Sequence, residues 1–250
     1  MAMIFSEASA RVILLDVEGT TTPIDFVYQV LFPYARLNVR AYLERNLSSQ
    51  DVRSDIAKLR LEHTEDLRNG LDPPPLCEQP PAAQVDSLVA YVHWLMDRDR
   101  KSTGLKSLQG RIWEEGYRKG DLRGQVFDDV PPAFARWTGQ GREICIYSSG
   151  SVLAQKLLFS HTTAGDLTGY IKEYFDTNVG AKVEAGSYAR IAAARQRHPS
   201  EILFVSDAPK ELEAAKASGM RTALCVRPGN PPQTPARDHP IIYSFDEVLL

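Results

Sequence analysis

From about Gly124 onward, the chain alternates between segments typical of strands and segments typical of helices. The strand-like segments are short apolar runs at residues 143–148, 201–207, 222–226 and 241–243. Helical patterns follow two of these runs, at residues 151–159 and 209–219, and Gly219 is placed to end the second helix. Such alternation predicts an α/β fold, in which a parallel sheet is covered by helices on both faces.

A further strand is predicted near the amino terminus, where the apolar residues 12–15 run directly into Asp16. Glu18 follows two positions later and would project to the same side as Asp16 if the chain stays extended. Gly19 then permits a sharp turn and a close backbone approach to a ligand. Ligands of open α/β sheets bind beyond the carboxyl ends of strands, so the acids indicate a metal site or a nucleophile beside an acid/base group. The simpler interpretation is a strand that ends in polar residues where it meets solvent.

The intervening residues 26–124 have the apolar spacing of helices and no strand pattern. Pro33 is expected to kink or interrupt the first helix, and Asp86 to cap a later one. Gly104 suggests a break, and the last helix should end near Gly120. We therefore expect an all-helical cap domain at residues 26–124, inserted after the first strand of a core formed by residues 1–25 and 125–250.

Composition limits the possible partners and the compartment. The chain has 250 residues, 43% of them hydrophobic, and a net charge of −3 without a basic stripe, so we expect no nucleic-acid partner. Its three cysteines show no paired spacing, which fits a reducing compartment. The first ten residues lack the pattern of a signal peptide, and no apolar run approaches transmembrane length. We expect a cytoplasmic protein without a membrane partner.

Three more polar positions lie at or near strand ends. Ser148 and Ser149 could bind a phosphate, although a plain helix start capped by Ser151 explains hydroxyls there equally simply. Lys182 precedes a helix and could contact a phosphate oxygen or simply lie in solvent. Asp207 follows a buried strand and could cap a helix or ligate Mg²⁺, which prefers oxygen ligands.

An acid pair, a hydroxyl, a lysine and a further acid follow one another here in the order found in the haloacid dehalogenase (HAD) superfamily. The chain resembles these phosphotransferases along its whole length, and one family within them more closely. The segments that resemble the enolase-phosphatases of methionine salvage, also called acireductone synthases, are "LLDVEGTTTPIDFV", "IYSSGSVLAQKLLFSH", "YFDTNVGAKVEAGSY" and "VRPGN". Glu18 supports this resemblance, because most HAD phosphatases have Asp two residues after the nucleophile and this family has Glu.

The resemblance implies a HAD-like, Rossmann-type sheet and a nucleophilic Asp16. It also implies one Mg²⁺ per subunit, held by Asp16, the backbone carbonyl of Glu18 and Asp207. An aspartate is already ionised at neutral pH, so its difficulty lies in approaching an anionic phosphate rather than in losing a proton. A divalent cation would offset that repulsion.

The remaining site residues also follow from the resemblance. Ser148, Ser149 and Lys182 would bind the substrate, and Lys182 would act in catalysis by steadying Asp16. Glu18 would protonate the leaving oxygen and then accept a proton from the attacking water. Alternatively, only the backbone of Glu18, and not its carboxyl group, contributes to the site. Arg227 follows a strand, and its role stays open.

The family converts 2,3-diketo-5-methylthiopentyl 1-phosphate into 1,2-dihydroxy-3-keto-5-methylthiopentene, an acireductone, by enolisation followed by dephosphorylation. We expect this reaction on a small phosphorylated diketone, carried out by a monomer. A HAD phosphatase for another small phosphorylated metabolite is the main alternative. A silent HAD-like binding protein is disfavoured by the intact acids, and a dehalogenase is disfavoured because its chemistry does not use the metal site.

Overall fold

The structure is a computed structural model, and it describes residues 10–232 and 238–249. The chain forms two compact units, one of Met1–Gln29 with Arg123–Leu250 and the other of Val30–Leu122. Their roles as catalytic core and cap, with the boundaries expected above, stay predictions. Nearly all of the segment examined for a signal peptide, and part of the proline-rich stretch before residue 241, lie outside the described residues.

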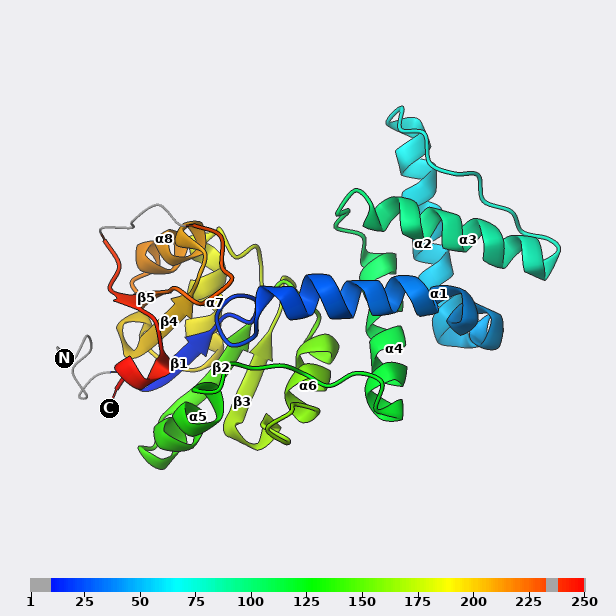
Figure 1. The fold of residues 1–250 in the computed structure, drawn as a ribbon. Coiled ribbons are helices and arrows are strands. Elements are labelled where there is room, and N and C mark those ends of the chain that lie inside the picture. Colours follow the sequence, from blue (N-terminus) through cyan, green and yellow to red (C-terminus); the bar gives the residue numbers. More distant parts are fainter. Residues whose placement is uncertain (1–9, 233–237, 250) are drawn as a thin grey trace. The chain divides into compact units, whose positions relative to one another are not determined.

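The first unit contains a six-stranded sheet in the order β3-β2-β1-β4-β5-β6, and all neighbouring strands are parallel (Figure 1). The strands are β1 (Val12–Leu15), β2 (Glu143–Tyr147), β3 (Ile171–Phe175), β4 (Ile202–Ser206), β5 (Arg221–Cys225) and β6 (Ile241–Ile242). Every residue of β1 and β4 is buried, which is why these strands are continuous apolar runs rather than alternating ones. The predicted α/β fold with an inserted helical segment is confirmed.

Helices cover both faces of the sheet (Figure 1). The helices are α5 (Val130–Gly139), α6 (Val152–Ser160), α7 (Ala185–Ala194) and α8 (Pro209–Ala217). Helices α7 and α8 pack through residues such as Tyr188 and Leu212 on the face that carries Val12 and Leu14. The sheet's alternating side chains therefore direct Ile13 and Leu15 to the opposite face, which α5 and α6 cover.

The strand order places a topological switch point between β1 and β4. From β1 the chain proceeds to β2 and β3 on one side, and it then returns to form β4, β5 and β6 on the other. Crevices at the carboxyl ends of strands on either side of such a point are the usual ligand sites of open α/β sheets. The residues that follow β1, β2 and β4 therefore lie where a ligand would bind.

Two core elements were not predicted from the sequence. Strand β3 lies at an edge of the sheet and carries Lys172 and Glu173, so it lacks the apolar run of a central strand. Helix α5 begins with Pro131 and Pro132 in its first turn, where proline is tolerated because the first amides have no helical acceptor.

The second unit, Val30–Leu122, is fully described and contains four α-helices. A π-helix, η1 (Phe26–Leu31), leads into them, and they are α1 (Phe32–Asn46), α2 (Gln50–Arg68), α3 (Pro81–Met96) and α4 (Thr103–Lys119). Pro33 lies in the first turn of α1, so the expected interruption occurs as a change from π- to α-helix. Gly120 ends α4 with a φ of 81°, as predicted.

Two expectations in this unit are wrong. Asp86 does not cap α3, because the helix already begins at Pro81, whose ring fixes a helical φ. Gly104 is not a break, because it lies in the first turn of α4, which Ser102 caps by accepting a hydrogen bond from Leu105 N. A Cβ at Gly104 would lie 2.8 Å from Leu59 Cγ, so this glycine permits close packing between α2 and α4.

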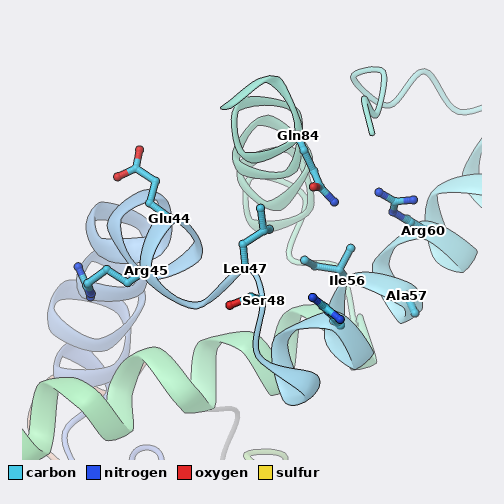
Figure 2. Close-up of a pocket in the computed structure, with 9 residues that line it drawn as sticks. Glu44, Arg45, Leu47, Ser48, Ile56, Ala57, Arg60 and Gln84 are labelled. Carbon is cyan, nitrogen blue, oxygen red and sulfur yellow. The ribbon is translucent and has the colours of Figure 1, made fainter. Parts of the chain in front are cut away.

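A surface groove of about 600 Å³ lies between α1, α2 and α3 (Figure 2). Three arginines line it, but Arg45 pairs with Glu115 and Arg60 with Glu78. These acids offset most of the positive charge, so the groove does not form a strong anion site. Across the described parts of both units, no helix has the length and apolar character needed to cross a membrane.

We expect Asp66→Ala to destabilise the helical unit by about 2–4 kcal/mol. Asp66 is almost fully buried, and it accepts hydrogen bonds from Tyr91 Oη at 2.8 Å and from Arg100 at 2.6 Å. Its removal leaves a buried hydroxyl unpaired. Chemical denaturation followed by circular dichroism measures the change. The control Asp97→Ala removes an exposed ion pair with Arg36 and should cost at most about 1 kcal/mol. Equal losses in the two variants would contradict the prediction.

Candidate active site

Adjacent strands bring three of the predicted site residues to one edge of the sheet. Asp16 follows β1, Ser148 follows β2 and Asp207 is the first residue beyond Ser206 in β4. Since β2, β1 and β4 are neighbours in parallel register, their carboxyl ends meet. The Asp16 amide donates to Val205 O at 3.0 Å, which extends the β1–β4 pairing as far as the acid itself.

Asp16 is buried and its carboxylate is held on both oxygens. Oδ1 accepts hydrogen bonds from Lys182 Nζ at 2.6 Å and from Val17 N at 2.7 Å, and Oδ2 accepts one from Ser206 Oγ at 2.9 Å. Only 3% of the residue is exposed. These contacts fix the orientation of the carboxylate, which a positioned nucleophile requires.

Lys182 lies in the turn before α7, where two tyrosines hold its backbone. Tyr188 Oη donates to Lys182 O at 2.7 Å, and Tyr147 Oη donates to Gly180 O at 2.9 Å. Burial alone would lower the pKa of the ammonium, but the charges of Asp16, Glu211 and Glu18 raise it overall. Lys182 therefore remains a cation at neutral pH.

Glu18 lies beside Ser148, whose hydroxyl is 3.3 Å from Glu18 Oε2. Burial, together with the negative charge of Asp16, raises the pKa of the Glu18 carboxyl. Ser148 also accepts a hydrogen bond from Gly150 N at 2.9 Å, whereas capping of α6 is done by Ser151. Ser148 is therefore not needed as the helix cap. Ser149 is exposed, and among the described residues its side chain forms no hydrogen bond with the other site residues.

Asp207 completes the acidic group. Burial and the charge of Asp16 raise the pKa of Asp207 to about 7. Its carboxylate is close to Gly19, since a Cβ on that glycine would clash with Asp207 Oδ2. The φ of +70° at Gly19 and this close approach both explain why glycine occupies the position.

Glu211 and Ser206 contact this group and were missed by sequence reasoning. Glu211 Oε2 lies 2.7 Å from Lys182 Nζ, and Ser206 Oγ lies within hydrogen-bond distance of both Asp16 and Glu211. Burial and the charge of Asp16 raise the pKa of Glu211 to about 8. The available signal was spacing: Glu211 follows Asp207 by four residues and lies in the first turn of α8.

In the loop of residues 17–22, one backbone carbonyl oxygen differs from the others in its hydrogen bonding. The oxygens of Val17 and Thr22 accept from amides of the loop itself, and that of Thr21 accepts from Phe127 N. Those of Gly19 and Thr20 accept from side chains described below. The Glu18 carbonyl oxygen accepts no hydrogen bond from the described residues.

This arrangement fits a small divalent cation. Four carboxylates, those of Asp16, Glu18, Asp207 and Glu211, interact electrostatically with the Lys182 ammonium, so additional positive charge would be stabilised here. The described chain contains no group of three His, Cys, Asp or Glu side chains placed to ligate a metal. A set of two carboxylates and one backbone carbonyl is a different arrangement, and such oxygen donors suit Mg²⁺.

Comparison with known proteins identifies the family of the chain. A family model described as haloacid dehalogenase-like hydrolase matches residues 10–219. The "Enolase-phosphatase E1" of Synechococcus elongatus is 49% identical to this chain, over 96% of the chain and 98% of that protein. The Drosophila melanogaster protein of the same name is 44% identical over 90% of the chain and 86% of its own length. The chain belongs to the enolase-phosphatase family of HAD-like hydrolases.

Solved structures give the same result for the fold. The UTR4 protein of Saccharomyces cerevisiae superposes with a TM-score of 0.77 at 34% identity, covering 95% of this chain and 99% of that one. A dehalogenase matches with a TM-score of 0.53 at 16% identity, over 96% of both chains, and this likeness extends to the fold alone. The chain is thus an α/β hydrolase of the HAD type, as the sequence predicted.

We expect Gly19→Ala to reduce phosphatase activity at least about tenfold, because the new methyl group would collide with Asp207. Gly70→Ala is a matched control: Gly70 has a similar φ of +75°, but a Cβ there meets nothing within 4 Å. Backbone strain should lower the stability of both variants by about 1 kcal/mol. Phosphate release and thermal melting are measured on both. A similar loss of activity in the two variants would show that strain, rather than displacement of Asp207, is responsible.

Proposed function

We propose that this chain converts 2,3-diketo-5-methylthiopentyl 1-phosphate into the acireductone 1,2-dihydroxy-3-keto-5-methylthiopentene and phosphate. The observation that supports this most directly is the buried Asp16 carboxylate, held by Lys182 and Ser206 at the carboxyl end of β1. Membership of the enolase-phosphatase family, at 49% identity over 96% of the chain, supports the choice of substrate.

In the proposed dephosphorylation, a carboxylate oxygen of Asp16 attacks phosphorus and the bond from phosphorus to the substrate oxygen breaks. Glu18 donates a proton to that leaving oxygen. Its raised pKa favours the protonated form that this step needs. Water then attacks the aspartyl-phosphate while Glu18 accepts its proton, which releases phosphate and restores Asp16.

The phosphate of the substrate needs positive charge and hydrogen-bond donors. Lys182 supplies a buried cation next to Asp16, so one ammonium group can both steady the nucleophile and attract a phosphate oxygen. Ser148 and Ser149 would contribute hydroxyl and backbone donors at the end of β2. Glu211 shares Lys182 with Asp16 and so restricts the position of the ammonium.

One Mg²⁺ per subunit would be held by Asp16, the Glu18 carbonyl and Asp207. When bound, it would supply charge neutralisation and polarise substrate oxygens. Burial, and then the charge of Asp16, raise the pKa of Asp207, and a bound cation would offset that charge. We propose that the enzyme acts as a cytoplasmic monomer. The free state of all three cysteines agrees with a reducing compartment.

The enolisation that precedes dephosphorylation needs a base near C1 of the diketone. Glu18 is the acid/base group beside Asp16, and we assign to it the transfer of the C1 proton. The same carboxyl would then receive a proton in the first step and deliver one to the leaving oxygen in the second. The helical cap predicted at residues 26–124 would exclude water from both steps.

With the diketone phosphate and Mg²⁺, we expect a transient enol absorbance followed by stoichiometric phosphate. Asp16→Asn should lower phosphate release by at least about 10³-fold, because the amide cannot act as the nucleophile. Stopped-flow absorbance and a phosphate assay follow the two steps separately. Phosphate release by the wild type without an enol would favour a HAD phosphatase for another metabolite.

Glu18→Gln should lower exchange of the C1 proton in heavy water by about 10²-fold or more, because glutamine cannot accept a proton. Proton NMR of the diketone phosphate measures the exchange directly. Asp25→Asn, at an exposed acid outside the group of site residues described above, serves as the control and should exchange at the wild-type rate. Normal exchange in Glu18→Gln would remove Glu18 from the enolisation step.

A further inference from the structure

A tight turn after β5 lies against the loop that carries Glu18. The turn has Pro228 and Gly229 at its centre, Gly229 has a φ of +87°, and the amide of Asn230 donates to Arg227 O at 3.1 Å. Proline followed by a glycine with positive φ is typical of a type II turn. The turn thereby fixes the directions of its two end residues, Arg227 and Asn230.

Asn230 joins the nucleophile loop to the second acid. Its Nδ2 atom donates to Gly19 O at 2.9 Å and lies 3.3 Å from Asp207 Oδ2. An amide nitrogen carries two hydrogens, so it can serve both acceptors at once. The opposite assignment of the amide would place its oxygen against a carbonyl and a carboxylate, which is electrostatically unfavourable.

Arg227 anchors the turn from its other end. The side chain is almost fully buried between the rings of Phe127 and Phe245, whose centroids lie 4.5 and 4.6 Å from the guanidinium carbon. Nη1 pairs with Asp129 at 2.7 Å, and Nε donates to Thr20 O at 3.1 Å. The guanidinium thus connects a rigid part of the core to the loop, and this contact limits how far the turn can shift.

Asn230 and Arg227 each donate a hydrogen bond to one backbone carbonyl oxygen in the loop of residues 17–22. The Gly19 carbonyl oxygen accepts a hydrogen bond from Asn230, and the Thr20 carbonyl oxygen accepts one from Arg227. Backbone amides donate to the carbonyl oxygens of Val17, Thr21 and Thr22. The other carbonyl oxygens of this loop are therefore all hydrogen-bonded. Rotation of the Glu18–Gly19 peptide would break the bond between Gly19 N and Thr22 O, and rotation of the next peptide would break the bond from Asn230 to Gly19 O.

We propose that Asn230, anchored by the Arg227 turn, is a positioning residue for this enzyme. It holds the Glu18–Gly19 segment and the Asp207 carboxylate in a fixed relation, so that two oxygen ligands on separate strand ends are preorganised for one divalent cation. This inference rests on the proposed function for its kinetic consequence. Its consequence for cation binding can be measured without turnover.

The test uses the full chain with Asn230→Ala and with Asn230→Leu, which keeps the approximate size of the side chain but removes its donors. Calorimetric titration of the metal-free protein with MgCl₂, without substrate, should give a Kd at least about tenfold weaker for both variants. In turnover, the Mg²⁺ concentration for half-maximal rate should rise by a similar factor. At saturating Mg²⁺, kcat should fall more than KM changes.

Asn46→Ala is the matched control, since Asn46 Nδ2 also donates to a backbone carbonyl, Tyr42 O at 2.9 Å, but lies in the helical unit. It should leave Mg²⁺ affinity unchanged. A purely structural role for Asn230 would lower the melting temperature and leave both the Kd for Mg²⁺ and kcat at wild-type values, and that result would overturn the proposal.

The experiments distinguish failure of the proposed function from failure of the positioning role of Asn230. A wild-type protein that binds Mg²⁺ but releases no phosphate from the diketone phosphate would refute the proposed function, while the calorimetric comparison would still decide the role of Asn230. A wild type active on that substrate, with variants that bind Mg²⁺ equally well, would refute the positioning role alone.

Discussion

The contact between Lys182 and Asp16 is the interaction on which the site depends. It joins groups 166 positions apart in the sequence at a distance of 2.6 Å, and both are buried. A buried charge left without its partner is strongly destabilising, so the fold must deliver both groups together. The β2–β1–β4 arrangement and the two tyrosines that hold the Lys182 segment accomplish this.

One ammonium group does not balance the acids around it. Glu18, Asp207 and Glu211 all have raised pKa values, chiefly because they are buried and lie near the charge of Asp16. Such unrelieved repulsion is common in sites that bind cations or transfer protons, because it is relieved when the ligand or proton arrives. The Glu18 carbonyl accepts no hydrogen bond within the described part of the chain, whereas its neighbours are hydrogen-bonded, and both observations fit the same interpretation.

Local sequence signals predicted strands and helix ends correctly where one local cause, such as an apolar run or a terminating glycine, determines them. The apolar runs of β1 and β4, and the glycine that ends α4, appear where expected. Gly104 was misread because its cause is tertiary: Leu59 of α2 approaches so closely that only a glycine fits. Asn230 and Glu211 were overlooked as site residues for a similar reason, since their importance lies in contacts with distant segments.

The sequence alone determined the alternation of strands and helices, the helical insertion and the acids at strand ends, because these depend on apolar periodicity and on residues adjacent in the chain. Resemblance to a family added candidate roles for six residues. The tertiary structure decided which groups meet: Asp16 with Lys182 and Ser206, Lys182 with Glu211, and Asn230 with Gly19 and Asp207. Hydrogen bonds and ion pairs depend on ångström-scale distances between segments, and the strand order that sets those distances is not written in any local pattern.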